Sequence, residues 1–151
     1  MTGFTARDPH FAARVGRSFA RQTMMATIGA SLLRVAPGEV DIALAVAPHI
    51  SQQHGFVHGG AIRSIADSAA GYAALTLMEA GSGILAVEFK INLLAPGRGE
   101  RLVAEGRVVR PGRTLSVSQA SVYAERNGQR EAVALLTATL MRLEGRDGVV
   151  D

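Results

Sequence analysis

The sequence predicts an α+β domain in which one long central helix is wrapped by a curved antiparallel β-sheet. Most of the chain alternates apolar and polar residues between turn residues, which is typical of half-buried strands. Segment 59–80 is the exception, because its apolar residues follow helical spacing and its alanines favour a helix. A single long helix buries its apolar face by packing on such a sheet.

The chain of 151 residues is long enough for one domain with a sizeable core. We expect residues 1–22 to form a helical segment that packs on the domain, residues 23–145 to form the domain, and residues 146–151 to form a tail. Arginines in the first segment loosely suggest a transit peptide, but an amphipathic helix is the favoured interpretation.

The individual elements follow from local pattern. Phe11, Val15 and Phe19 share one face of the expected N-terminal helix. One or two strands precede the long helix, and four antiparallel strands follow it. Asn127-Gly128 is a strong hairpin signal between the last two strands. The expected strands are 40–46, 85–93, 100–110, 114–125 and 130–142.

Composition excludes several classes of protein. The absence of cysteine rules out a disulfide framework, a thiol nucleophile and a thiolate metal site. The formal net charge is +3, and nearly all the positively charged side chains are arginines, which suit a small anionic ligand. The sequence has no run of basic residues of the kind that would indicate nucleic-acid binding. The longest apolar stretch, 68–78, is about half a membrane span. We therefore expect a cytoplasmic protein without nucleic-acid or membrane partners.

The chemical signal lies where the long helix begins. Gly59 and Gly60 leave main-chain N–H groups unshielded at a helix start, where unpaired donors and the helix dipole favour negative charge. Asp67, in the same helix, is the only carboxylate between Asp41 and Glu79. A thioester carbonyl that becomes an oxyanion needs such donors, and a carboxylate can activate water or attack directly.

The spacing of these residues implies a shared site. Gly59 and Asp67 are eight residues apart, or about 12 Å along a helix. A reacting carbon must lie about 3 Å from both the donor and the attacking group. If both residues are catalytic, an antiparallel helix of a second subunit must supply one of them, which gives two equivalent sites per dimer.

Each feature has a simpler interpretation that the residues alone leave open. Asp67 could form a solvated ion pair with Arg63, and a glycine pair is often only turn chemistry. His54 and His58 are better explained as hydrogen-bonded loop residues than as metal ligands, so no metal is expected.

The runs His58-Gly59-Gly60-Ala61-Ile62 and Ile65-Ala66-Asp67-Ser68-Ala69-Ala70-Gly71 resemble the signature of hotdog-fold acyl-CoA thioesterases of the phenylacetate-pathway type. Residues 88–96 also resemble the family's strand after the helix. The resemblance implies a hotdog fold, a homodimer or homotetramer with sites at the subunit interface, and hydrolysis of aryl- or medium-chain acyl-CoA without a cofactor.

The resemblance also implies roles for individual residues. Asp67 would be the general base or nucleophile, and the Gly59 amide the oxyanion donor from the other subunit. Gln52 falls where relatives contact the thioester or the lytic water, His58 would position the carbonyl, and the Gly60 amide is expected to contact substrate.

The CoA phosphates have a weaker candidate site. Arg113 and Thr114 follow Pro111-Gly112 in an expected exposed turn with one cation, although an ordinary solvated arginine is the favoured interpretation of this turn.

Two rival functions remain. Hotdog proteins also dehydrate hydroxyacyl thioesters, but the loop before His58 lacks the prolines typical of those enzymes. A non-catalytic acyl-CoA-binding hotdog protein would keep the fold and would not need Asp67.

Overall fold

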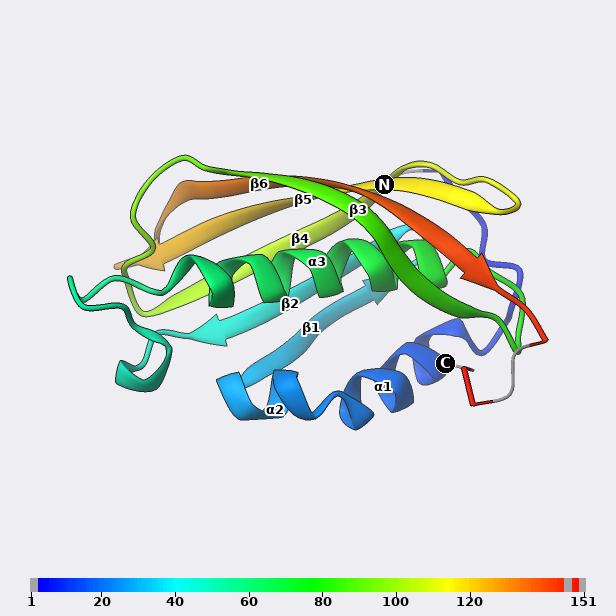
Figure 1. The fold of residues 1–151 in the computed structure, drawn as a ribbon, viewed down its shortest axis with the longest axis horizontal. Helices are drawn as coiled ribbons and strands as arrows, with labels where there is room; N and C mark the ends of the chain where they lie inside the picture. The colour runs from blue at the N-terminus through cyan, green and yellow to red at the C-terminus, as the bar shows by residue number, and fades with distance from the viewer. Residues whose placement is uncertain (1–2, 146–147, 150–151) are drawn as a thin grey trace.

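The computed structural model of the chain describes residues 3–145 and 148–149, so the expected tail lies largely outside the described residues. One long helix lies across the concave face of a six-stranded antiparallel sheet, as the sequence predicts (Figure 1). The elements are α1 (Phe11–Arg21), α2 (Thr23–Ile28), β1 (Ala30–Ala36), β2 (Glu39–Ala45), η1 (Pro48–Ile50), α3 (Gly59–Leu75), β3 (Gly83–Leu93), β4 (Arg101–Arg110), β5 (Leu115–Arg126) and β6 (Gln129–Leu143).

The sheet has the strand order β1-β2-β4-β5-β6-β3, which leaves β1 and β3 at its edges. All neighbouring strands are antiparallel, and all five expected strands are present. The predicted hairpin is confirmed, because Arg126 pairs with Gln129 and both turn residues, Asn127 and Gly128, have positive φ.

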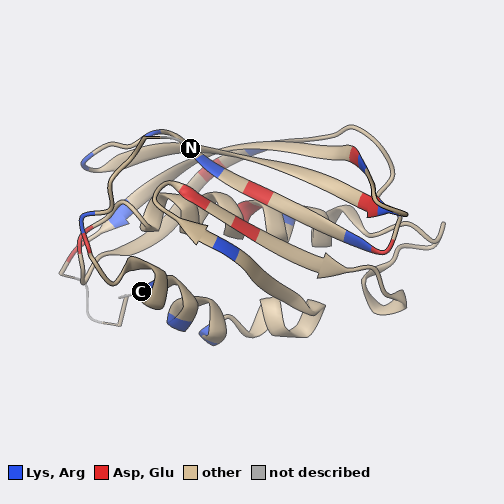
Figure 2. Cartoon of the chain, turned by 180° about the vertical axis from the view of Figure 1, so that it is seen from behind, with Lys and Arg blue, Asp and Glu red and all other residues tan. Residues whose placement is uncertain are grey.

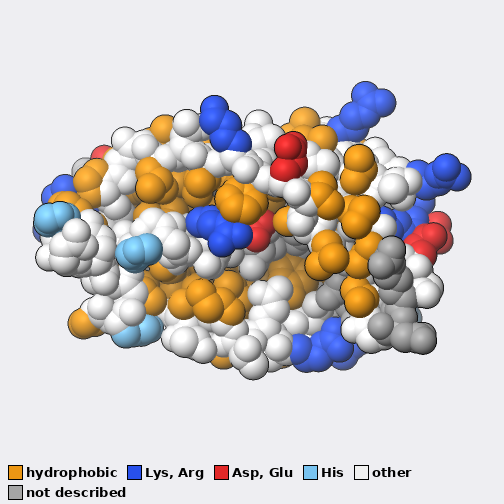
Figure 3. Space-filling model, in the orientation of Figure 1, with side chains coloured by type: hydrophobic (Ala, Val, Ile, Leu, Met, Phe, Trp, Pro, Cys, Tyr) orange, Lys and Arg blue, Asp and Glu red, His pale blue; other side chains and the backbone are white. Residues whose placement is uncertain are grey.

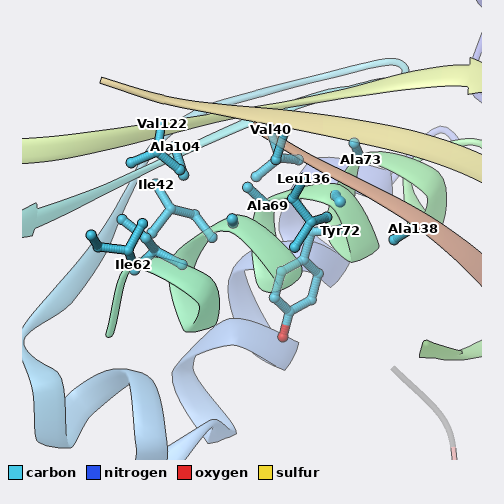
Figure 4. Close-up of a cluster of buried hydrophobic side chains, with 14 of the residues drawn as sticks. Val40, Ile42, Ile62, Ala69, Tyr72, Ala73, Ala104, Val122, Leu136 and Ala138 are labelled. Carbon is cyan, nitrogen blue, oxygen red and sulfur yellow. The ribbon is translucent and has the colours of Figure 1, made fainter. Parts of the chain in front are cut away.

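The core lies between the sheet and α3. Inward-facing residues from the strands meet the buried face of α3, where alanines let the helix approach closely (Figure 4). Gly106 of β4 marks a close approach, because a Cβ at that position would overlap the main chain of Ala69. The outer face of the sheet carries cross-strand ion pairs instead, such as that between Arg107 and Asp41 (Figure 2).

The long helix is shorter than the sequence predicts. It ends at Leu75, and the Thr76 hydroxyl donates to the Ala73 carbonyl at 2.6 Å while accepting from the Gly38 N–H at 2.7 Å. Buried Arg14 of α1 donates to the carbonyls of Leu75, Met78 and Glu79. These contacts satisfy carbonyl groups that a helix end otherwise leaves unpaired.

The N-terminal segment packs against the helix and the edge strand β1 (Figure 1). The expected helix is present, and Val15 on its predicted apolar face is fully buried. A second short helix, α2, was not predicted. It ends at Ile28 and is capped by Gly29, whose φ of 79° lets the chain turn into β1.

Candidate active site

The loop before α3 is held in place by its main chain. The His58 N–H donates to the Ile50 carbonyl at 2.8 Å, and the Val57 N–H donates to the Gly97 carbonyl at 2.9 Å. His58 is the N-cap of α3, and its Nδ1 accepts a hydrogen bond from the Gly60 N–H at 2.9 Å. The imidazole therefore fixes the first turn of the helix.

This cap decides which amide is free at the helix start. The Gly60 N–H is engaged by His58, and a Cβ on Gly60 would lie 2.9 Å from that ring nitrogen. Within the part of the chain that the structure describes, nothing accepts a hydrogen bond from the Gly59 N–H. The Gly59 amide is thus a donor without a partner, while substrate contact by Gly60 stays a prediction.

Gly59 faces a hollow that we call the amide hollow. Its walls are apolar apart from Gln52, and a Cβ on Gly59 would meet only the end of the Leu93 side chain, at 3.2 Å. Gln52 closes the turn below it, because its carbonyl accepts from the Gly55 N–H and its side-chain oxygen accepts from the His54 N–H. The amide hollow is lined by Gln52, Phe56, Val57, Gly59, Ile62, Leu93, Leu94, Ala95, Pro96 and Gly97.

Asp67 lies two turns further along α3 in a second depression, the acid hollow. Its Oδ1 is buried and receives no hydrogen bond from the described residues, and its Oδ2 lies 3.9 Å from a guanidinium nitrogen of Arg63. Burial raises the pKa of Asp67, and the charge of Arg63 lowers it, with a net shift upward. The acid hollow is lined by Gln22, Asp67, Ser68, Gly71, Tyr72, Ile84, Leu85, Ala86 and Leu140.

Polar side chains near Asp67 form a network that the sequence did not reveal. The Gln22 amide donates to the Tyr72 hydroxyl at 2.8 Å, and the Ser68 hydroxyl lies 3.4 Å from the Gln22 oxygen. Ser68 and Tyr72 are four residues apart on α3, so helical spacing places them on one face. Nothing in the sequence places Gln22 there, because it comes from the junction of α1 and α2.

The predicted site residues thus fall into separate regions of one chain. Gln52 and Gly59 share the amide hollow, and Asp67 lies in the acid hollow. Arg113 and Thr114 lie in the exposed turn between β4 and β5, where Arg113 lines a depression with Met78, beyond the C-terminal end of α3. Contact between this turn and CoA phosphates stays a prediction.

Two general features complete the description. Over residues 3–145 and 148–149, no three His, Cys, Asp or Glu side chains are grouped as a metal site requires. None of the helices in this range is long and apolar enough to span a bilayer.

Comparison with known proteins places this geometry in a family. The model of the thioesterase superfamily matches residues 54–131, which include the loop, α3 and four of the strands in whole or part. A curated relative, a putative esterase of Deinococcus radiodurans, is 34% identical over 118 residues, covering 78% of this chain and 77% of the relative.

Solved structures agree with this assignment. A thioesterase family protein from Silicibacter pomeroyi is 48% identical, with a TM-score of 0.88 over 89% of this chain and 99% of that one. A variant of the phenylacetic acid degradation protein PaaI from Thermus thermophilus is 30% identical, with a TM-score of 0.70 over 81% of this chain and 100% of that one. The predicted hotdog fold and the resemblance to thioesterases of the phenylacetate-pathway type are confirmed.

Proposed function

The chain belongs to the thioesterase superfamily, and on that basis we propose that it hydrolyses aryl- or medium-chain acyl-CoA thioesters in sites shared between two subunits. The product pair is the free acid and CoA. Each site combines Asp67 of one subunit with the Gly59 amide of the other.

One observation carries this proposal: the two groups that the reaction needs are each unpartnered in the single chain. The Gly59 N–H has no acceptor among the described residues, and the buried Asp67 Oδ1 has no donor. They lie about 12 Å apart along α3, too far for one thioester carbon to reach both. A two-fold related copy of α3 supplies the missing half to each site at once.

The surface beside α3 supports a second copy as the occupant. β3 is an edge strand with a free hydrogen-bonding side, and such edges are usually covered or blocked by charge. Here large apolar side chains stay exposed along and just after the strand, and Figure 3 shows orange side chains spread over this face. They are Leu85, Val87, Phe89, Leu93 and Leu94, with exposures of 39–59%.

The groups divide the chemistry between them. If Asp67 is a general base, it takes a proton from a water molecule as the water oxygen attacks the thioester carbon. If Asp67 is the nucleophile, its own carboxylate oxygen attacks that carbon to form a mixed anhydride, which water later cleaves. In both routes the carbonyl oxygen gains negative charge beside the Gly59 amide, and the C–S bond then breaks to release CoA. His58 holds the helix start that presents this amide, and we assign Gln52 to the thioester or the lytic water.

The Asp67→Asn variant tests the acid. We expect the release of free thiol from a panel of acyl-CoA substrates to fall by at least about 10²–10⁴-fold, because the amide can neither accept the proton nor attack. Glu88→Gln is the matched control, since Glu88 lies on neighbouring β3 with its carboxylate bonded to Thr139. Full activity in Asp67→Asn would remove Asp67 from the mechanism while leaving acyl-CoA hydrolysis itself in place.

Gly59→Pro tests the amide with little structural disturbance. Gly59 is the first residue of α3, where proline is well tolerated, and the His58 ψ of 136° suits a residue that precedes proline. The substitution therefore deletes the N–H and keeps the helix.

Mixing the two variants tests whether the sites are shared. In an equal mixture of inactive Asp67→Asn and Gly59→Pro subunits, half of the dimers are mixed and each contains one intact site. We expect about a quarter of wild-type activity to return. No recovery in dimers shown to exchange subunits would place both groups in the same chain's site. A single turnover in water labelled with oxygen-18 separates the two routes, because label that appears in the Asp67 carboxylate would identify Asp67 as the nucleophile.

A further inference from the structure

Arg63 occupies an unusual position between the two hollows. Its guanidinium carbon lies 4.4 Å above the centre of the Phe89 ring on β3, and one of its nitrogens lies 3.9 Å from Asp67 Oδ2. The side chain is nevertheless 46% exposed, so solvent or another chain can reach it. Cation–π contact and the ion pair together fix where this charge sits.

Helix α3 indicates where the two-fold axis of the proposed dimer passes. If Asp67 meets Gly59 of an antiparallel copy, residues whose numbers sum to 126 lie opposite one another. Arg63 is the midpoint between Gly59 and Asp67, so it lies opposite its own copy. The axis therefore passes α3 at Arg63.

The same premise applied to strand β3 gives a consistent position for the axis. Leu85 lines the acid hollow, and Leu93 lies against Gly59 in the amide hollow. A two-fold axis that brings one hollow to the other places Leu85 beside the partner's Leu93. The midpoint of this strand is then within one residue of Phe89, allowing for the bulge between Ala86 and Glu88. Phe89 is the ring on which Arg63 rests.

From these two estimates we propose that Arg63 is a positioning residue of the shared site, and that the two Arg63–Phe89 pairs of a dimer face each other at its two-fold axis, between the two active sites. This inference rests on the proposed shared site. Each guanidinium holds Asp67 by Oδ2 and leaves the buried Oδ1 directed to the reaction.

No other charged group competes for this role in the described part of the acid hollow. The neighbours of Asp67 there are neutral: Gln22 from the α1–α2 junction, Leu140 from β6, and Ser68 and Tyr72 from α3. On β3, Glu88 pairs with Thr139 and Lys90 with Thr137, so both project from the face opposite to Phe89. Arg63 alone opposes the rise in the pKa of Asp67 that burial causes.

Crosslinking tests the axis without reference to activity. The chain has no cysteine, so an Arg63→Cys variant carries one thiol per subunit. We expect a short bismaleimide to link its two subunits, and likewise those of Phe89→Cys. Gly71→Cys is the matched control on α3: a Cβ there meets nothing within 4 Å, but two copies of residue 71 would lie about 24 Å apart along the helix direction. Unlinked Arg63→Cys and Phe89→Cys subunits, in samples that are dimeric by light scattering, would overturn the placement.

The pH profile tests the positioning role. Arg63→Met keeps the length of the side chain and removes its charge, so the pKa of Asp67 rises. We expect the acidic limb of kcat/KM to move to higher pH, and Arg63→Lys to move it back. A limb that stays in place in Arg63→Met would overturn the role. A wild-type chain inactive on every acyl-CoA would instead refute the proposed function, and the crosslinks would still decide the axis.

Discussion

Gly106 of β4 lies where the sheet approaches the main chain of α3, the helix that carries both proposed catalytic residues. A Cβ added at residue 106 would lie 2.8 Å from the Ala70 nitrogen and closer still to the Ala69 carbonyl. Both atoms belong to the main chain of α3, so no side chain can turn away to relieve the overlap. In Gly106→Ala the helix must therefore move as a body.

The size of this movement follows from ordinary contact distances. Carbon atoms in contact lie about 3.5–4.0 Å apart, and the added Cβ would lie well inside that distance from the Ala69 carbonyl carbon, so α3 must retreat by about 1–2 Å. Overpacking of this kind costs about 1–3 kcal/mol, which exceeds the roughly 0.5–1 kcal/mol that replacing a strand glycine with alanine would otherwise gain. For a chain of this size we expect Tm to fall by about 2–8 °C. Asp67 lies half a turn from Ala69, and a displacement of 1 Å at a catalytic group can cost about 10²-fold in rate.

Thermal unfolding and steady-state hydrolysis measure the two effects. Gly16→Ala is the matched control, because Gly16 lies inside α1 and a Cβ there meets nothing within 4 Å. We expect this control to gain about 0.5–1 kcal/mol from helix propensity. A Gly106→Ala protein as stable and as active as the wild type would show that β4 does not fix the position of α3.

Three further substitutions probe the surroundings of the helix. The raised pKa of Asp67 means that its favourable contribution is complete below its ordinary value of 3.8 and is lost as pH rises through the folded-state value. Urea titrations should therefore find Asp67→Asn more stable than wild type at neutral pH and equal to it near pH 3. Arg14→Met leaves buried Asp8 and the carbonyls at the end of α3 without the arginine that they contact. We therefore expect the free energy of unfolding in the same titration to fall by about 3–5 kcal/mol, against less than about 0.5 kcal/mol for the exposed control Arg17→Met. Tyr72→Phe removes the hydroxyl that Gln22 and Ser18 contact, and its thermal unfolding should report a loss of about 1 kcal/mol.

The strands were predictable because their residues alternate in the chain itself. Pairing across Asn127-Gly128 needs only a turn that accepts positive φ, and both residues accept it. The start of α3 was also predictable, since a glycine pair after a polar residue is a local signal. Its end was not, because Thr76 bonds to Gly38 and Arg14 reaches the last carbonyls from α1. Tertiary contacts, and not local propensity, stop the helix there.

The same division applies to the site. Arg63 and Asp67 are one helical turn apart, so the sequence could raise their ion pair as an alternative to catalysis. The structure is compatible with both interpretations at once, because Arg63 lies beside one carboxylate oxygen and the other receives no hydrogen bond from any residue that the structure describes. Phe89 could not be foreseen as its partner, since the contact depends on the register of β3 beside α3.

The groups left unsatisfied in the single chain share a physical logic. Among the described residues nothing donates to the buried Asp67 Oδ1, and such an oxygen costs folding free energy, so a fold selected only for stability would pair it with an internal donor such as the half-buried Gly59 amide. Pairing them within one chain would require both to lie within one turn of α3, and an acid so close to the amide would occupy the space of the thioester. In the proposed dimer, separating them by eight residues keeps that space open and makes closure of the site depend on a second copy. On that proposal, the separation that prevents one chain from completing the site is also what leaves room for the substrate.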